Sequence, residues 1–205
     1  VGTDRQNDKQ LYLRKEGKWT KVSKATVGES VIPLSISSSG KYLYTIDNKN
    51  QDLKGIFKLN LEDLSYKNIY TDKSVDVTDV EMTTDGRSAY ALRVDDGYPA
   101  YLILNKGLEE AKVFKNLLKS FPFSEVQITS KTQDGNIYIV KVSSDIDPGS
   151  LYLFDKKQNQ LKSLFKFKPD VKSSDFAQTE PIKFKASDSK AINGFFTPAI
   201  SNNKE

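Results

Sequence analysis

Carboxylates gather at two places in the sequence. Asp72, Asp76 and Asp79 lie close together, and Asp145 and Asp147 form a second group. Carboxylate oxygens are the ligands that calcium prefers, and a pair of them can work as a general acid and base. The spacing matches no known calcium loop, and both groups fall where turns are expected, so we favour acidic side chains that accept hydrogen bonds from the backbone. We assign no metal and no catalytic carboxylate.

Two clusters of serine and glycine could hold a nucleophile. They are Ser37-Ser38-Ser39-Gly40 and Gly28-Glu29-Ser30. Neither has the Gly-x-Ser-x-Gly pattern of a nucleophile elbow, which also needs a histidine partner. The chain contains no histidine and no cysteine, which excludes Ser-His catalysis, thiolate catalysis, disulfides and zinc-thiolate sites. We assign no catalytic and no cofactor-binding residue and expect the chain alone to be inactive, although chemistry through carboxylates or lysine stays open.

The charge balance indicates no strongly charged partner. The 205 residues include 31 basic and 27 acidic side chains, for a net charge of +4. The most basic stretch holds Lys156, Lys157, Lys162, Lys166, Lys168 and Lys172. It could attract an anionic partner, but lysines on an edge strand also discourage unwanted strand pairing, and we favour this solvated edge. We expect no nucleic-acid partner.

No apolar run approaches the roughly 18 residues needed to cross a bilayer. We therefore expect a water-soluble domain with no membrane partner, either cytoplasmic or periplasmic. The chain starts at Val1-Gly2, with no initiator methionine and no apolar signal region. This start predicts an excised piece or a processed product.

A segment repeats three times along the chain. Each repeat has a Ser-Gly or Asp-Gly turn followed by a strand pattern that contains a tyrosine. The turns are Ser39-Gly40, Asp85-Gly86 and Asp134-Gly135, and the tyrosines are Tyr44, Tyr90 and Tyr138. The glycines are 46 and 49 residues apart. A period in this range with about four strands per unit is typical of propeller blades.

We therefore predict an all-β fold, a partial β-propeller over residues 1–167. Its three four-stranded blades lie near 31–71, 77–114 and 124–165, and a hairpin over residues 11–22 forms an incomplete blade before them. The second blade is expected to end in a strand at 111–114, followed by a helical turn at 115–120. Asp147-Pro148-Gly149 is the expected middle turn of the third blade, because this order of residues is typical of turns. Residues 168–179 form a linker.

The segment after the linker predicts two strands joined by an Asp-containing turn. Its notable residues are Glu180-Pro181, Phe184, Asp188, Ile192, Gly194-Phe195 and Thr197-Pro198. This pattern resembles the junction between propeller and α/β-hydrolase domain in serine peptidases of the prolyl oligopeptidase family, in the branch with acylaminoacyl peptidases and dipeptidyl aminopeptidases. Ser189 stands where that family usually has glycine, which we expect to change the turn.

The resemblance implies that residues 180–205 begin a hydrolase domain. In that family the propeller covers the active site and limits substrate size, while the catalytic Ser, Asp and His lie in the hydrolase domain. We therefore predict a non-catalytic propeller fragment of a serine oligopeptidase, with a peptide substrate and the missing hydrolase domain as its partners in the parent enzyme. The parent's specificity, endo- or exopeptidase action and blade number stay open.

A second hypothesis is a stand-alone binding module for a protein partner, similar to the propeller of the TolB translocation protein. Propellers close into rings of four to eight blades. Three blades and a hairpin would leave open apolar faces and unpaired strand edges, and such surfaces recruit partners. We therefore also predict that the chain self-associates.

Overall fold

The computed structural model describes residues 2–3, 9–23 and 26–200. The chain divides into two compact units, residues 1–95 with 101–104 and residues 96–100 with 105–205. The predicted boundaries at 167 and 179 both lie inside the second unit and stay predictions, and residues 201–205 of the predicted hydrolase segment lie outside the described part. Within that part, no helix has the length and apolar character to cross a membrane.

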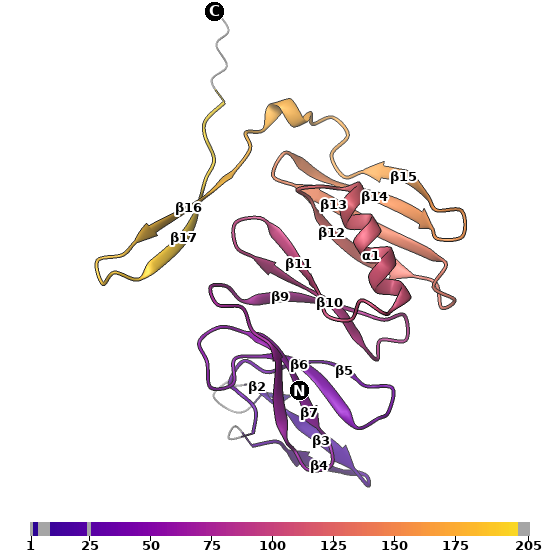
Figure 1. Cartoon of the computed structure of the whole chain (residues 1–205), viewed down its shortest axis with the longest axis vertical. Helices are drawn as coiled ribbons and strands as arrows, with labels where there is room; N and C mark the ends of the chain where they lie inside the picture. Colours follow the sequence, from indigo (N-terminus) through magenta and orange to yellow (C-terminus); the bar gives the residue numbers. More distant parts are fainter. Residues whose placement is uncertain (1, 4–8, 24–25, 201–205) are drawn as a thin grey trace, which may run out of the picture. The chain divides into compact units, whose positions relative to one another are not determined.

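The first unit consists of antiparallel strands (Figure 1). Two short ladders come first: β1 (Gly2–Thr3) with β2 (Lys9–Gln10), and β3 (Tyr12–Lys15) with β4 (Lys18–Lys21). A four-stranded sheet follows in chain order, with β5 (Ile32–Ile36), β6 (Tyr42–Asp47), β7 (Gly55–Asn60) and β8 (Tyr66–Tyr70). The next sheet has three strands, β9 (Val77–Met82), β10 (Ala89–Asp95) and β11 (Pro99–Ile103), and its last strand begins in the second unit.

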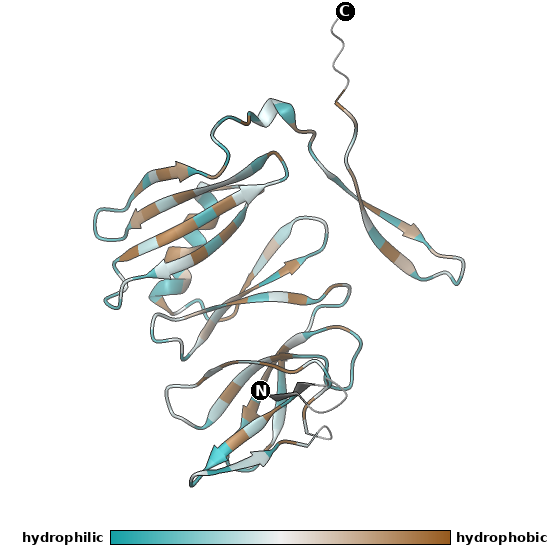
Figure 2. Ribbon diagram, turned by 180° about the vertical axis from the view of Figure 1, so that it is seen from behind, coloured by the Kyte–Doolittle hydropathy of each residue, from teal (hydrophilic) through white to brown (hydrophobic). Residues whose placement is uncertain are grey.

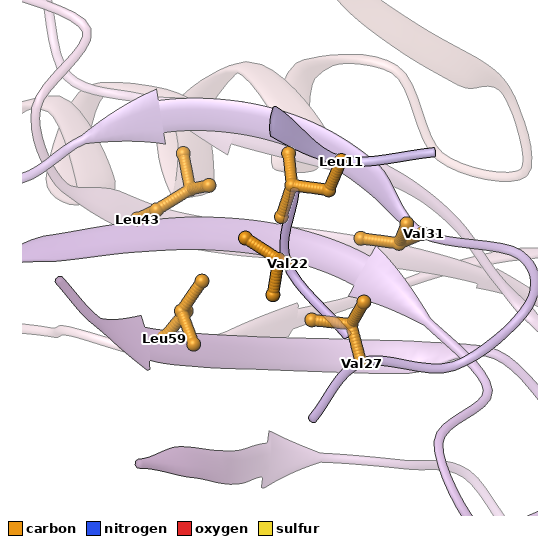
Figure 3. Close-up of a cluster of buried hydrophobic side chains, with 6 residues drawn as sticks. All are labelled: Leu11, Val22, Val27, Val31, Leu43 and Leu59. Atoms are coloured by element: carbon orange, nitrogen blue, oxygen red, sulfur yellow. The ribbon is translucent and has the colours of Figure 1, made fainter. Parts of the chain in front are cut away.

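Apolar cores join neighbouring sheets in the described part of the first unit. The first core joins the segment around β3 and β4 to the four-stranded sheet; it consists of Leu11, Val22, Val27, Val31, Leu43 and Leu59 (Figure 3). The second joins β6 and β7 to β9 and β10; it consists of Ile46, Ile56, Val77, Val80, Leu92 and Val94. Val and Ile suit these positions because β-branched side chains pack well on a pleated surface. Each core is therefore made by residues of neighbouring repeats.

The second unit contains a helix, a four-stranded sheet and a terminal hairpin. The elements are α1 (Glu109–Ser120), β12 (Glu125–Lys131), β13 (Ile137–Ser144), β14 (Asp147–Asp155), β15 (Gln160–Lys166), a short 3₁₀ turn η1 (Ser173–Asp175), β16 (Glu180–Lys185) and β17 (Ala191–Phe196). Strands β12 to β15 pair in chain order, and β16 pairs with β17 alone. The predicted all-β, propeller-like fold is confirmed.

A helix replaces the strand that was expected at 111–114. The buried side chains of α1 are Ala111, Val113, Phe114 and Leu117, and the spacing of three between 111, 114 and 117 gives a helix one apolar stripe. Acidic residues occupy its first turn and Lys119 its last, which complements the helix dipole. The four-strand prediction for the second blade is wrong here: its sheet has three strands in the described residues, and the predicted helical turn begins earlier, at Glu109.

Helix α1 lies over one face of the β12–β15 sheet (Figure 1). Glu109 at its start is 3.9 Å from Lys156 in the turn after β14. Phe121, which ends the helix, has its ring centroid 4.9 Å from that of Tyr152 in β14. These contacts fix both ends of the helix against the same sheet.

The middle turn of the third sheet also differs from expectation. Asp147, Pro148 and Gly149 belong to strand β14, and the turn is formed by residues 145–146. Asp147 pairs with Ser144, and the ladder between β13 and β14 shifts register between Val142 and Ser144, so Pro148 and Gly149 form a bulge opposite Ser143. Gly149 fits this bulge because its φ of 124° is strained for any residue with a Cβ.

The same six-residue turn joins the first two strands of each of the three sheets. The turns cover residues 37–42, 83–88 and 132–137. The first amide donates to the sixth carbonyl at 2.8, 2.8 and 3.0 Å, and the fourth amide donates to the first carbonyl at 2.9, 2.7 and 2.9 Å. The fourth residues, Gly40, Gly86 and Gly135, have φ of 71°, 69° and 64°, a left-handed conformation that glycine adopts without cost.

Side-chain oxygens complete each turn. The hydroxyl of the first residue, serine or threonine, accepts the amide of the sixth at 3.1, 3.0 and 3.1 Å. The oxygen of the third residue, serine or aspartate, accepts the amide of the fifth at 3.4, 3.0 and 3.1 Å. The repeat seen in the sequence is therefore a repeated hydrogen-bond pattern.

Alanine at a turn glycine should destabilise the fold through backbone strain. At Gly86 the nearest atom to an added Cβ is Ser35 Oγ at 3.8 Å, so no clash arises. The only cost of the added Cβ is the strain of a left-handed φ. We expect Gly86→Ala to lower the free energy of unfolding by about 1–2 kcal/mol in urea titrations followed by circular dichroism. Gly107→Ala is the control, since Gly107 lacks a positive φ; an equal loss there would contradict the role of the turn.

The third turn should also be visible in a titration. The Thr132 hydroxyl, then the Asn136 side chain and amide, lower the pKa of Asp134 to about 2. A lowered pKa in the folded state means that the ionised carboxylate stabilises the turn above about pH 4 and that this support is lost as the pH falls through 2. We expect Thr132→Val to raise the Asp134 pKa towards its ordinary 3.8 in an NMR titration of the carboxyl carbon. Thr129→Val, which removes a hydroxyl bonded to Ile139, should leave it unchanged.

Candidate functional site: the terminal hairpin and its pocket

The β16–β17 hairpin has one face made of apolar side chains. Ile182 lies opposite Gly194 and Phe184 opposite Ile192, and alternate residues of a strand share a face. The apolar side chains of this face, and their exposed fractions, are Ile182 41%, Phe184 51%, Ile192 40% and Phe196 53%. Figure 2 shows these apolar positions alternating with polar ones along the hairpin. We call this set the open face.

The opposite face of the hairpin contacts the rest of its unit. Pro181 lies against Gly97, so that a Cβ added to Gly97 would be 2.5 Å from the Pro181 Cβ. The Lys183 ammonium is 2.9 Å from a carboxylate oxygen of Asp96. The hydroxyl of Tyr98 donates to the Thr179 carbonyl at 3.4 Å. The hairpin is therefore seated on the turn before β11.

A second attachment comes from the turn between β13 and β14. The Thr179 amide donates to Asp145 Oδ2 at 2.6 Å, and the Thr179 hydroxyl shares a hydrogen bond with that of Thr197 at 2.8 Å. Asp145 thus connects the β13–β14 turn to Thr179 at the start of the hairpin, and Thr179 connects that start to Thr197 at its end. The sequence grouped Asp145 with Asp147, but Asp147 instead accepts the Gly149 amide at 2.9 Å.

A pocket of about 260 Å³ lies beside the hairpin. Its walls come from the turn before β11, the segment before β12, the β13–β14 turn and the hairpin itself. The lining residues are Gly97, Tyr98, Pro99, Phe123, Glu125, Ser143, Ser144, Asp145, Thr179 and Phe195. Three aromatic rings and two carboxylates therefore surround one small volume.

Phe123 is held in an unusual conformation at this pocket. Its φ is 58°, in the left-handed region where a bulky side chain is an outlier. Its side chain is 83% exposed, so burial does not compensate for the strain. Phe123 and Tyr98 were not predicted from the sequence, because blade periodicity assigns both to connections. The Phe121-Pro122-Phe123 run was the available sign.

Ser189 lies in a left-handed conformation in the turn between β16 and β17. Its φ is 66°, and its amide donates to the Ala186 carbonyl at 2.9 Å. The Ala186 amide in turn donates to the Lys190 carbonyl at 2.9 Å. Serine thus adopts a left-handed conformation that glycine adopts more easily, with strain at a residue with a Cβ; that this changes the turn relative to the family stays a prediction.

The other predicted carboxylates hold loops together. Asp72 Oδ1 accepts the Ser74 amide at 2.9 Å and Asp72 Oδ2 accepts the Tyr70 hydroxyl at 2.8 Å. Asp76 accepts the Lys54 amide at 2.8 Å, and Asp79 accepts the Val80 amide at 2.8 Å. Across the described ranges, no three His, Cys, Asp or Glu side chains come together as a metal site.

The serine and glycine clusters have structural positions as well. Residues 37–40 form the first repeated turn. Gly28 donates its amide to Asp47 Oδ2 at 2.7 Å, and the fully buried Asp47 carboxylate also accepts the Tyr66 hydroxyl at 2.9 Å. Burial raises the pKa of Tyr66 well above its ordinary value, so this hydroxyl remains a donor. Ser30 donates its amide to Asn48 Oδ1 at 3.3 Å.

The lysine-rich stretch follows the outermost strand of its sheet. Lys162 and Lys166 lie on β15, which pairs with β14 only and is exposed along its whole length. Lys156 approaches Glu109 of α1 at 3.9 Å. This arrangement agrees with a solvated edge protected by lysine.

The sequence comparisons found no match: no protein-family model matches the chain, and neither does any curated protein. Comparison of structures found several similar folds. A prolyl endopeptidase structure has a TM-score of 0.57 at 12% identity and covers 91% of this chain and 27% of its own. Prolyl oligopeptidase B from Galerina marginata has a TM-score of 0.55 at 12% identity, with 94% and 28% covered. A puromycin-hydrolysing peptidase of Mycobacterium tuberculosis has a TM-score of 0.54 at 11% identity, with 90% and 28% covered.

These likenesses establish a fold like the propeller of prolyl oligopeptidases. The chain spans little more than a quarter of the length of these structures, so an activity cannot be transferred with the fold. TolB from Acinetobacter baumannii also resembles the chain, with a TM-score of 0.47 at 14% identity and 92% of this chain and 46% of its own covered. This score is too low to support the TolB-like hypothesis.

A side chain at Gly97 should displace the hairpin. Gly97 has φ of 99°, and the added Cβ would overlap Pro181, whose ring cannot turn away. We expect Gly97→Ala to accelerate hydrogen exchange at the Thr179 amide by at least about tenfold, because the bond to Asp145 opens more often. Gly107→Ala in the same unit is the control. Unchanged exchange at Thr179 in Gly97→Ala would contradict the proposed seat.

Proposed function

We propose that the chain is the late part of the propeller of a serine peptidase of the prolyl oligopeptidase family, together with the first hairpin of its hydrolase domain. In this proposal the propeller limits which peptides reach an active site that lies in the hydrolase domain. The chain supplies a docking surface and a barrier, and it supplies no catalytic residue.

The observation that carries the proposal is the open face of the β16–β17 hairpin. A two-stranded hairpin is marginally stable alone and needs further strands or a packed layer. Ile182, Phe184, Ile192 and Phe196 lie on one side of it with 40–53% of their surface exposed, while the other side is already seated on its unit. An apolar face of this kind suits packing against a further layer of a larger domain.

The comparison with prolyl oligopeptidases supports the propeller part of the proposal only. The assignment to the branch with acylaminoacyl peptidases and dipeptidyl aminopeptidases rests on the junction motif, from Glu180-Pro181 to Thr197-Pro198. The predicted self-association rests on the same open face, since two copies could cover it mutually.

The coding frame provides the first test. We expect it to continue beyond the codon for Glu205 with a Gly-x-Ser-x-Gly motif, then an aspartate and then a histidine, the order usual for the α/β-hydrolase fold. The product of the whole frame should react with a fluorophosphonate that labels the nucleophilic serine, and the 205-residue chain should not. A frame with no such motif would refute the peptidase proposal.

A substitution on the open face tests the docking role. In the whole protein we expect Phe184→Ser to lower the free energy of unfolding by about 3 kcal/mol, because a buried aromatic side chain is lost. In the 205-residue chain, where Phe184 is half exposed, the loss should stay below about 1 kcal/mol. Lys185→Ser, on the seated face of the same strand, is the control. Equal effects of Phe184→Ser in both proteins would contradict docking through this face.

A further inference from the structure

The pocket beside the hairpin has walls that suit a positive charge. Of the described residues that line it, Glu125 and Asp145 are acidic and none is basic. Lys183, on the neighbouring strand, is 2.9 Å from Asp96 and so neutralises a carboxylate outside the lining. The described lining therefore holds two carboxylates and no basic side chain, although the whole chain carries +4.

Three aromatic residues also line the pocket. Tyr98, Phe123 and Phe195 come from three separate segments, and each lines the same volume. The face of an aromatic ring is negative and attracts cations. Rings and carboxylates in one small pocket thus favour the same class of ligand, an organic cation with an apolar stem.

The size of the pocket limits the ligand further. Its volume of about 260 Å³ is below the roughly 300–1,000 Å³ of sites for drug-sized molecules. One long side chain fits this volume better than a whole peptide. Lysine and arginine combine an apolar stem with a charged end, so they match both the aromatic walls and the carboxylates.

Asp145 can still accept further hydrogen bonds while it holds the hairpin. Its Oδ2 accepts the Thr179 amide at 2.6 Å, and an ionised carboxylate can accept several hydrogen bonds at once. Asp145 can therefore hold the hairpin and bind a cation at the same time. The NMR signal of the Thr179 amide should therefore shift when a cation binds in the pocket.

We propose that this pocket binds the cationic side chain of a lysine or arginine in a polypeptide. The ammonium or guanidinium group lies between the carboxylates of Glu125 and Asp145, and the stem lies against the rings of Tyr98, Phe123 and Phe195. This site is a property of the 205-residue chain and does not depend on whether a hydrolase domain follows it.

The test uses the 205-residue chain and matched small probes. N-acetyl-lysine methylamide is titrated by calorimetry and by NMR of the Gly97 and Thr179 amides. N-acetyl-norleucine methylamide has a similar stem without the charge, and norleucine methylamide carries its charge on the amino terminus. We expect the lysine probe to shift both amides and to bind at least tenfold more tightly than either norleucine probe. Equal binding of a norleucine probe, or no binding of the lysine probe, would overturn the proposal.

Variants connect the binding to the named residues. Glu125→Gln with Asp145→Asn keeps oxygens that can accept the Thr179 amide but removes both charges, and we expect at least tenfold weaker binding of the lysine probe. Asp147→Asn removes a charge from the start of β14 outside the pocket lining and should change binding less than twofold. Phe123→Gly removes a ring and relieves its left-handed strain, so it should weaken binding without unfolding the protein. Unchanged binding in the double variant would refute the proposed site.

Discussion

The left-handed glycine turn is the constraint on which the repeated sheets depend. A turn that closes with φ near 70° at Gly40, Gly86 and Gly135 sets which residues of two successive strands face each other. A slip of one residue would move every core side chain to the wrong face. The register that these turns set therefore decides which side chains of each sheet reach the cores of the first unit. This local origin explains why the pattern survives although the repeats share few residues.

The terminal hairpin is attached through one face only. No described element covers its open face. Its seated face is held by Pro181 against Gly97, by the Lys183–Asp96 ion pair and by the Thr179–Asp145 hydrogen bond. Exposed ion pairs contribute little individually, so close packing and the charge-assisted hydrogen bond carry most of the attachment. A hairpin anchored on one face only is well placed to join a second layer.

The sequence was sufficient where structure is decided locally. The repeated turns, the strands around them and the hairpin at residues 180–198 were predicted because turn residues and alternation report on nearby backbone. The sequence was insufficient where a tertiary contact determines the secondary structure or the site. The segment at 111–114 has apolar residues that suit a strand or a helix, and the face of the β12–β15 sheet selects the helix α1. The pocket could not be predicted, since Tyr98, Phe123 and Phe195 meet only after three segments have folded.

Gly28 and Asp47 show how such a chain can diverge in sequence and still keep its shape. The buried Asp47 carboxylate accepts the Gly28 amide, and a Cβ at position 28 would lie 2.4 Å from Asp47 Oδ1. Neither residue can change without cost: a side chain at 28 has no room, and loss of the carboxylate leaves the part-buried Gly28 amide without this acceptor. Over evolutionary time we expect both positions to be retained, because a Cβ at position 28 would also lie 2.9 Å from the Lys49 backbone nitrogen, while the exposed residues of neighbouring strands can vary more freely.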